Sequence, residues 1–292
     1  MMMRQVLRAR NFSIRTIETI ARVSVAFAVL VVSSHSIASA AAVCSRTVRN
    51  CGCSINSAGV YTLAQDLTFA AGGGDCLTVN AKNVVLNLNG HNITGPGQAS
   101  NGAGVHVKKV STVTVEGQGT ASQRAIVSGW RYGIENDGNA VLIENVDLTG
   151  NTGAGMFFFQ AGSSELVNFN ASNNSGFGVW LRAGSNIQIG SGTASLNNSD
   201  GIFIGCIGNG KGGCSGGGGK ANSNYVYGVT ATNNGGGGIT VQFNGDFNQI
   251  GTCTASGNTG NDLVDRNPGA NGCAHDLWYA NHADSVNKSC IQ

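Results

Sequence analysis

Two acidic residues, Glu135 and Asp137, stand two positions apart in a segment with the pattern of a β-strand. Alternate residues of a strand point to the same face and lie about 7 Å apart. That separation falls within the range of roughly 6.5–9.5 Å typical of the carboxyl pair of inverting glycoside hydrolases. The pair therefore has the chemistry of a general acid and a general base acting on a glycosidic bond.

Two basic residues, Lys108 and Arg182, indicate a different reaction. Elimination from a uronic acid needs a base near the C5 proton and positive charge opposite the sugar carboxylate. Lys108 and Arg182 offer these groups, so the candidate catalytic residues are Lys108, Glu135, Asp137 and Arg182. The alternative is that all four are solvated charges on a sheet face.

Repeated glycines indicate how these side chains are positioned. Gly133, Gly155, Gly178, Gly201 and Gly238 each precede an apolar run, at steps of 22, 23, 23 and 37 residues. The long step contains a glycine-rich insertion, predicted as a loop over residues 206–222, without which the period is again 23. Short strands at this period bury an apolar face only when they stack as coils about 4.8 Å apart. The sequence therefore predicts an all-β parallel β-helix.

Equivalent positions of successive repeats should then form columns. The inward positions Met156, Val179, Ile202 and Ile239 should form one internal column. One asparagine per coil should form a stacked amide ladder at a corner, with sugar binding as the alternative role. This ladder comprises Asn151, Asn174, Asn197, Asn234 and Asn258.

Two outward lines follow from the same alignment. The first contains His106, Glu135, Phe157, Trp180, Phe203 and Thr240, and the second contains Lys108, Asp137, Phe159, Arg182, Gly205 and Gln242. Sugar rings pack their CH faces on aromatic rings, and exposed aromatics in a row need an explanation. We expect a ligand-binding surface made of Phe157, Phe159, Trp180, Phe203, His106 and Gln242. The alternatives are that the rings only stabilise the sheet by stacking, or that the insertion or the C-terminal segment covers them.

The repeats and both ends of the chain resemble the pectate-lyase-like superfamily of right-handed parallel β-helix proteins. The opening "GVYTLAQDLTFAAGGGDCLTVNAKNVVLNLNGHNITG" and the ending "GNDLVDRNPGANGCAHDLWYANHADSVNKSC" are similar to the NosD-like branch of carbohydrate-binding and sugar-hydrolase β-helix proteins. The resemblance covers about residues 51–290 and implies a single-stranded right-handed parallel β-helix. It implies little about activity, because this architecture hosts lyases, hydrolases, epimerases and non-catalytic proteins.

Catalytic motifs of well-known members are missing. The sequence lacks the D-D, G-H-G and R-x-K motifs that accompany N-x-D in polygalacturonases, and it lacks the D-P-H-D of mannuronan C5-epimerases. It offers few carboxylates for the calcium cluster of pectate lyases, so calcium is unsupported. His106, His275 and His282 show no close ligand spacing, and we expect no metal or other cofactor.

Nine cysteines divide into structural groups. Cys253 takes an inward position and should be a buried free thiol. Cys206 and Cys214 should pair across the insertion, and Cys273 and Cys290 should fix a C-terminal cap over residues 260–292. Cys44, Cys51, Cys53 and Cys76 should form two bridges in an N-terminal cap, with the pairing open and a zinc site as the alternative.

The N-terminus has the pattern of an export signal. Five arginines precede an apolar run, Val23 to Val32, that is too short to span a membrane, and Ala38-Ser39-Ala40 fits a cleavage site. We predict a signal peptide over residues 1–40 and a β-helix domain over residues 41–292, in a secreted or periplasmic protein. Loss of five arginines and Glu18 leaves 12 basic and 14 acidic residues, which disfavours nucleic acid as a partner.

Three functions remain open from the sequence. The first is a polysaccharide lyase or glycoside hydrolase, and the second is a non-catalytic protein that binds a polysaccharide or cell-surface glycan along the aromatic line. The third is a structural or adhesive surface protein. We expect no membrane partner after signal cleavage, and the sequence leaves the oligomeric state open.

Overall fold

The computed structural model describes residues 42–69, 73–118, 123–207, 219–267, 273 and 275–291. The regular structure in these ranges is β-strand, apart from one short 3-10 helix, η1 (Gly97–Ala99). No helix in them is long and apolar enough to cross a membrane. The predicted signal peptide, residues 1–40, lies outside the described residues, as do residues 208–218 of the predicted insertion.

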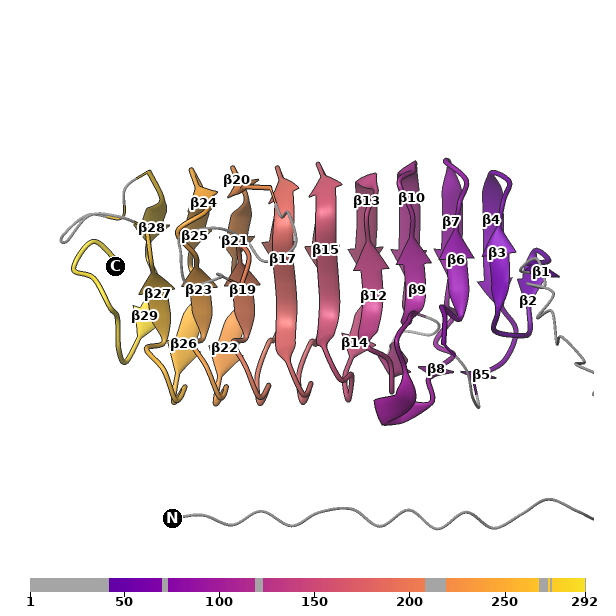
Figure 1. Ribbon diagram of the computed structural model, residues 1–292, viewed down its shortest axis with the longest axis horizontal. Helices are drawn as coiled ribbons and strands as arrows, with labels where there is room; N and C mark the ends of the chain where they lie inside the picture. The colour runs from indigo at the N-terminus through magenta and orange to yellow at the C-terminus, as the bar shows by residue number, and fades with distance from the viewer. Residues whose placement is uncertain are drawn as a thin grey trace, which may run out of the picture. The chain divides into compact units, whose positions relative to one another are not determined.

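Three parallel ladders run the length of the coil stack (Figure 1). The first contains β1 (Ala42–Val43), β3 (Cys53–Ile55), β6 (Leu77–Val79), β9 (Ala103–Val107), β12 (Tyr132–Asn136), β15 (Ala154–Gly162), β17 (Phe177–Ser185), β19 (Ile202–Ile204), β23 (Ile239–Val241) and β27 (Leu263–Asp265). The second contains β2 (Thr47–Val48), β4 (Gly59–Leu63), β7 (Val84–Asn87), β10 (Ser111–Glu116), β13 (Asn139–Glu144), β16 (Glu165–Val167), β18 (Gln188–Gly190), β21 (Tyr225–Tyr227), β25 (Gln249–Gly251) and β28 (Leu277–Tyr279).

The third ladder has shorter strands. It contains β5 (Leu67–Thr68), β8 (Ile93–Thr94), β11 (Ala125–Ser128) and β14 (Val146–Leu148), and it continues through single bridges at Asn170 and Thr193 to β22 (Thr230–Thr232), β26 (Thr254–Ser256) and β29 (His282–Ala283). Two further strands, β20 (Ala221–Asn222) and β24 (Gly245–Asp246), extend from the end of β17. The chain is therefore a right-handed parallel β-helix, as predicted.

The predicted internal column is present. Met156 pairs with Val179, Val179 with Ile202, and Ile202 with Ile239, and all four are fully buried. Each apolar side chain thus packs on its equivalent one coil away, so the core runs continuously along the stack. The sequence period fixed this register correctly across the glycine-rich insertion.

Repeat glycines lie where adjacent coils approach most closely. A Cβ on Gly178 would lie 2.5 Å from the carbonyl oxygen of Gly201 in the next coil and 2.6 Å from that of Ala171. Gly155 and Gly201 meet their neighbours in the same way. Close backbone approach, and not a left-handed conformation, therefore explains why glycine recurs at this position.

The asparagine ladder is also confirmed. The Nδ2 atoms of Asn151, Asn174, Asn197 and Asn234 each donate to the Oδ1 atom of the next ladder asparagine, at 2.9–3.2 Å. Each of these oxygens also accepts the backbone N–H of the preceding asparagine. The ladder therefore satisfies backbone groups at one corner of the five coils that it joins.

Disulfides fix both ends of the stack. Cys44 pairs with Cys53 and Cys51 with Cys76, which settles the pairing left open by the sequence in favour of two bridges. Cys273 pairs with Cys290 as predicted, and Cys253 is a buried free thiol. Cys206 is disulfide-bonded, while its predicted partner Cys214 lies outside the described residues. Disulfides of this kind persist in oxidising compartments, which indicates an extracellular or periplasmic protein.

Candidate functional site

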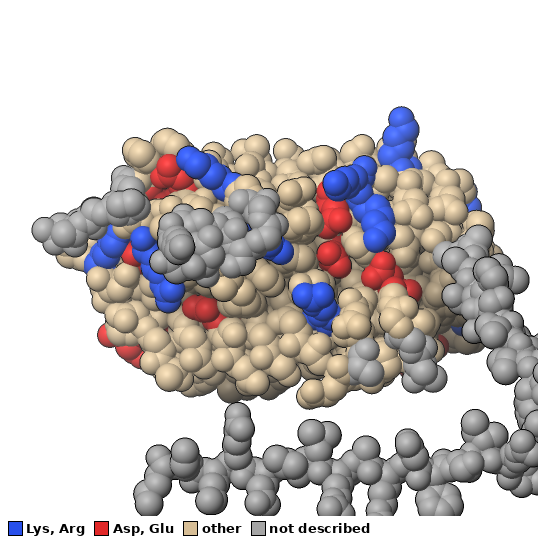
Figure 2. Space-filling view, viewed as in Figure 1, with Lys and Arg blue, Asp and Glu red and all other residues tan. Residues whose placement is uncertain are grey.

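A cleft of about 390 Å³ opens on the outer face of the first ladder, over β9, β12, β15 and β17. We call it the His106 cleft. It is lined by Gly74, Asp75, Asn101, Gly102, His106, Lys108, Arg131, Tyr132, Glu135, Phe157, Phe159 and Arg182. Acidic and basic side chains lie close together on this face of the molecule (Figure 2). The cleft thus combines both charge signs with aromatic rings.

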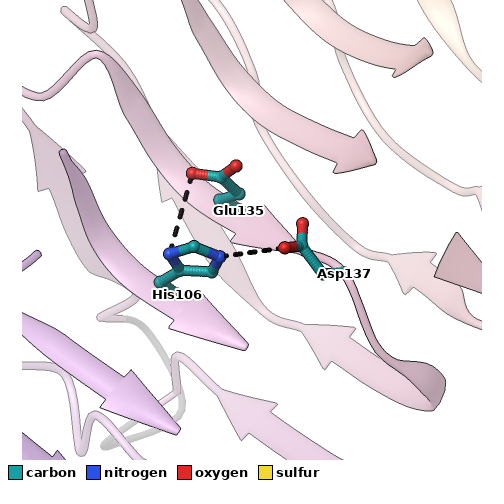
Figure 3. Close-up of side chains that lie close together, drawn as sticks. All are labelled: His106, Glu135 and Asp137. Atoms are coloured by element: carbon teal, nitrogen blue, oxygen red, sulfur yellow. Dashed lines mark hydrogen bonds and ion pairs between the residues drawn. The ribbon is translucent and has the colours of Figure 1, made fainter. Parts of the chain in front are cut away.

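His106 lies at the centre of a group of carboxylates (Figure 3). Its Nδ1 atom lies 2.9 Å from Asp75 Oδ2 and 3.8 Å from Glu135 Oε2, and its Nε2 atom lies 3.3 Å from Asp137 Oδ2. The register of β9 on β12 places His106 directly beside Glu135, while Asp137 follows the end of β12. Three carboxylates thus converge on one imidazole whose side chain is 9% exposed.

The carboxylates control the protonation of His106. Burial works to lower the pKa of His106, but the hydrogen bonds to Asp137 and Asp75 and the charge of Glu135 outweigh it and raise that pKa to about 9. Burial also raises the pKa of Glu135, whereas His106, the Ala103 backbone N–H and Lys108 lower the pKa of Asp75 despite its burial. Without a metal, His106 is therefore an imidazolium at neutral pH.

Lys108 adds a second cation to the group. Its Nζ atom lies 2.8 Å from His106 Nδ1 and 3.6 Å from Asp75 Oδ2. An ammonium and an imidazolium N–H are both donors, so the short Lys108–His106 contact is a hydrogen bond only if Nδ1 carries no proton. With three carboxylates nearby, we favour the protonated imidazole, and Lys108 then pairs with Asp75.

The Asp137 carboxylate is only half satisfied. Its Oδ2 atom accepts from His106, but its Oδ1 atom is buried and has no hydrogen-bond partner. A buried carboxylate oxygen without a donor is costly and calls for an explanation, such as a bound ion or water. One oxygen of Asp137 also lies within 4.8 Å of one oxygen of Glu135 and of one His106 nitrogen.

The separation of the two carboxylates differs from the sequence expectation. Two oxygens of Glu135 and Asp137 lie within 4.8 Å of each other, closer than the expected separation of about 7 Å. Both side chains point toward the His106 imidazole (Figure 3). The sequence alignment put His106 in the same outward line as Glu135 but predicted no contact between them. His106 thus contacts both carboxylates that an inverting hydrolase would direct at water and at the glycosidic oxygen.

Aromatic rings continue from the cleft along the stack. Tyr132 stacks on Phe157 with ring centroids 4.3 Å apart, and Phe157 contacts Trp180 at 4.8 Å. Phe177 then bridges Trp180 at 5.2 Å and Phe203 at 4.8 Å. We call these rings, with Phe159 beside Phe157, the aromatic strip. Apart from Phe203, the rings of the strip belong to a second apolar cluster outside the core.

Burial divides the strip into two sets. Phe157 and Phe203 are only 3% and 5% exposed, so they support their neighbours, whereas Phe159, Trp180 and Phe177 are half-buried. Trp180 is held by a hydrogen bond from Nε1 to the Gly205 carbonyl oxygen at 3.0 Å. Arg182 lies over the Phe159 ring, 5.3 Å from its centroid.

The predicted site residues fall into a connected group with one exception. His106, Lys108, Glu135, Phe157, Phe159 and Arg182 line the cleft, Asp137 contacts His106, and Trp180 and Phe203 extend the strip. Gln242 is 5% exposed and lies beside Gly205, away from the cleft lining.

Sequence reasoning missed Asp75, Arg131, Tyr132 and Phe177. Tyr132 and Phe177 occupy the position just before each repeat glycine, a third outward line that reads Ala103, Tyr132, Ala154 and Phe177. Extending the alignment to the residue before each glycine, three residues before the first outward line, finds both. Asp75 lies before β6 and reaches His106 across 31 residues of sequence, for which the repeat gives no signal.

Solved structures similar to this one include two polysaccharide-acting proteins. The A-module of an Azotobacter vinelandii mannuronan C-5 epimerase is 14% identical with a TM-score of 0.48, covering 75% of this chain and 65% of its own. The pectate lyase Pel9A is 14% identical with a TM-score of 0.43, covering 84% and 70%. The enzymatically active domain of a bacteriophage CBA120 tailspike protein is 13% identical with a TM-score of 0.47, covering 82% and 40%.

These values carry no inference about activity. The chain spans less than two thirds of the epimerase module and of the tailspike domain. No protein-family model matches the sequence, and no curated protein matches it significantly. The ladders and the columns of the core identify the chain as a right-handed parallel β-helix.

Proposed function

We propose that the protein binds an acidic polysaccharide along the aromatic strip, with the anionic groups of the glycan in the His106 cleft. The observation that carries this proposal is the unbroken series of ring contacts from Tyr132 to Phe203, which begins in a cleft lined by Lys108, Arg131 and Arg182. Aromatic rings can stack on sugar rings, and neighbouring cations can bind carboxylates, so this surface suits an acidic polysaccharide.

The spacing of the strip supports a polymer in preference to a small molecule. The rings come from successive strands β12, β15, β17 and β19, which repeat every 4.8 Å or so along the stack. A glycan chain advances by a comparable distance per sugar residue. The half-buried rings, Phe159 on β15 and Phe177 and Trp180 on β17, offer ring surface to sugars one coil apart.

The arginines support an anionic glycan. Arg131 lies over Tyr132 at 5.0 Å from the ring centroid, and Arg182 lies over both Phe159 and Trp180. Stacking on aromatic rings orients a guanidinium group, whose planar donors suit a carboxylate. Both arginines thus combine ring contact with charge at the edge of the strip.

Catalysis is the finer form of this proposal, and the charges favour a lyase over a hydrolase. In a β-elimination, the deprotonated Tyr132 hydroxyl would remove the C5 proton, and the C4–O4 bond would break as the C4–C5 double bond forms. The Lys108 ammonium would give a proton to the departing oxygen, while Arg131 and Arg182 neutralise the uronate carboxylate. A hydrolase would instead rely on Glu135 and Asp137, which are both engaged by His106. The alternative to both is a structural or adhesive protein with no glycan ligand.

Affinity electrophoresis through gels that contain polygalacturonate, alginate or a glycosaminoglycan tests binding. We expect at least one gel to retard the wild-type protein, and we expect Trp180→Ala and Arg131→Gln to abolish the retardation. Phe247→Ala is the matched control, because Phe247 is an aromatic residue, 54% exposed, outside the strip. Equal retardation of wild type and Trp180→Ala on every glycan would contradict the proposal. A rise in absorbance at 235 nm separates a lyase from a binding protein.

We also propose that residues 1–40 direct export and are removed. Amino-terminal sequencing of the protein recovered outside the cytoplasm should begin at Ala41. A protein that retains the arginines of residues 1–40 would contradict this proposal.

A further inference from the structure

We propose that His106, Glu135 and Asp137 form a binding site for a divalent transition metal such as Zn²⁺ or Mn²⁺. The proposal does not depend on glycan binding. One ligand atom from each of the three side chains lies within 4.8 Å of the other two, a spread that one metal ion can bridge. β9 and β12 supply His106 and Glu135, and Asp137 follows β12 (Figure 3).

The unpartnered Asp137 oxygen is the first reason to expect a cation. Asp137 Oδ1 is buried and has no donor within hydrogen-bond distance, although the other oxygen contacts His106. The protein thus keeps one oxygen of the Asp137 carboxylate away from solvent without a hydrogen bond. A metal ion that binds this carboxylate would supply the missing interaction.

The position of Asp75 is the second reason. Histidines that bind metals almost always donate their other ring N–H to a carboxylate, which fixes the tautomer and the ring orientation. Asp75 Oδ2 lies 2.9 Å from His106 Nδ1 and is available for this role. Nε2 then faces Asp137 with its lone pair, on the side of the ring opposite Asp75.

Charge balance is the third reason. Asp75, Glu135 and Asp137 carry three negative charges around His106, and Lys108, which contacts Asp75, carries one positive charge. With a neutral His106, the charges of these four side chains add up to about −2, and a divalent ion at this point offsets them. The Lys108 side chain is 42% exposed, so its ammonium has room to turn toward solvent when a metal enters.

The donor set favours a transition metal over calcium. Calcium and magnesium prefer oxygen ligands only, whereas zinc and manganese accept one imidazole with carboxylates. The sequence analysis considered only the spacing of the histidines. It therefore missed that Glu135 and Asp137, on the adjacent coil, lie close to His106.

Calorimetric titration of the chelator-treated full chain with Zn²⁺, Mn²⁺ and Ca²⁺ tests the site in the absence of glycan. We expect one equivalent of Zn²⁺ or Mn²⁺ to bind at least tenfold more tightly than Ca²⁺. His106→Gln and Asp137→Asn should weaken binding by about 100-fold or more, and Asp75→Asn by about 10- to 100-fold. Glu144→Gln is the control, because Glu144 belongs to an acidic group with Glu116 and Glu165 that contains no histidine.

A second measurement keeps the proposal testable if the variants fold poorly. The electron spin-echo signal of Mn²⁺ bound to the wild-type chain should show coupling to ¹⁴N, which only a nitrogen ligand produces. Absence of binding by both Zn²⁺ and Mn²⁺, absence of ¹⁴N coupling, or unchanged affinity in well-folded Asp137→Asn would each overturn the proposal. Such a failure leaves the gel-retardation result, and with it the proposed glycan binding, unaffected.

Discussion

The side chains of Asn174 and Asn197 join two coils through a hydrogen bond from Asn174 Nδ2 to Asn197 Oδ1, 3.0 Å long. The same Oδ1 atom accepts the Asn174 backbone N–H at 3.0 Å. Asn197 Nδ2 in turn donates to the Ala171 carbonyl oxygen at 3.0 Å and to Asn234 Oδ1 at 3.1 Å. One buried amide therefore links groups from three coils.

Replacing Asn197 with Ala should lower the free energy of unfolding by about 3–5 kcal/mol, because several buried partners lose their hydrogen bonds together. Asn198→Ala is the matched control, since Asn198 is an exposed asparagine one residue away, and it should change stability by about 0.5 kcal/mol or less. Urea denaturation followed by circular dichroism measures both. Equal stability of the two variants would show that the ladder does not stabilise the fold.

Leu196 has a left-handed backbone conformation at a corner where the neighbouring coils have glycine or asparagine. Its φ is +58°, and the equivalent corners carry Gly150, Asn173, Asn233 and Gly257, also at positive φ. Leu196 is 54% exposed, so its side chain gains little from packing. Asparagine and glycine tolerate the left-handed conformation, whereas leucine is strained in it.

We therefore expect Leu196→Asn to raise the free energy of unfolding by about 0.5–1 kcal/mol. Leu196→Ala keeps a Cβ at the same φ and serves as the control that should gain less. Thermal and urea unfolding of the three proteins compare them. A Leu196→Asn protein that is less stable than wild type would mean that the leucine side chain contributes packing that outweighs the backbone strain.

The sequence predicted those features that repeat at the coil period. The columns Met156–Val179–Ile202–Ile239 and Asn151 to Asn258 both follow from an alignment on five glycines, since stacking forces equivalent residues into contact. The outward line from His106 to Thr240 is correct for the same reason.

Features outside the repeat were beyond the reach of that alignment. Asp75 reaches His106 from a segment before β6, and side-chain rotation brings Glu135 and Asp137 around one ring. The period places Cα atoms and assigns faces, but it carries no information on rotamers or on the burial of Phe157 and Phe203. The second ladder, Asn224–Asn248–Asp276, follows the insertion in the sequence and was likewise missed.

Cys253 should be unreactive in the folded protein. Its side chain lies in the core at 1% exposure, and burial raises the pKa of its thiol to about 11 despite contacts with backbone groups. Labelling with a maleimide at pH 7.5 should leave Cys253 unmodified for hours, and the same reagent in 6 M guanidinium chloride should modify it within minutes. Peptide mapping assigns the label, and modification of Cys253 without denaturant would contradict the buried placement.

Asp276 should make stability depend on pH in a defined window. It ends the second amide ladder, where its Oδ1 atom accepts the Asn248 backbone N–H at 2.7 Å and Asn248 Nδ2 at 3.1 Å. Burial raises the pKa of Asp276 to about 6, the Asn248 and Asn267 hydrogen bonds lower it in part, and the charge of Asp265 raises it further. The unfolded chain has an ordinary aspartate pKa of about 3.9.

Between these two values the folded protein therefore binds a proton that the unfolded chain has lost. The contribution of Asp276 to stability is complete below about pH 4 and is lost as the pH rises through 6, by roughly 1–2 kcal/mol. Asp276→Asn removes this titration at a constant cost. An asparagine whose oxygen keeps the two Asn248 hydrogen bonds presents an NH2 group to Asn267 Nδ2, so that hydrogen bond is lost at every pH. Urea denaturation of both proteins from pH 4 to 8 gives the difference in unfolding free energy. That difference should shrink as the pH rises, because only wild type loses the protonated carboxyl, and a difference that is flat or grows with pH would mean that Asp276 is ionised throughout.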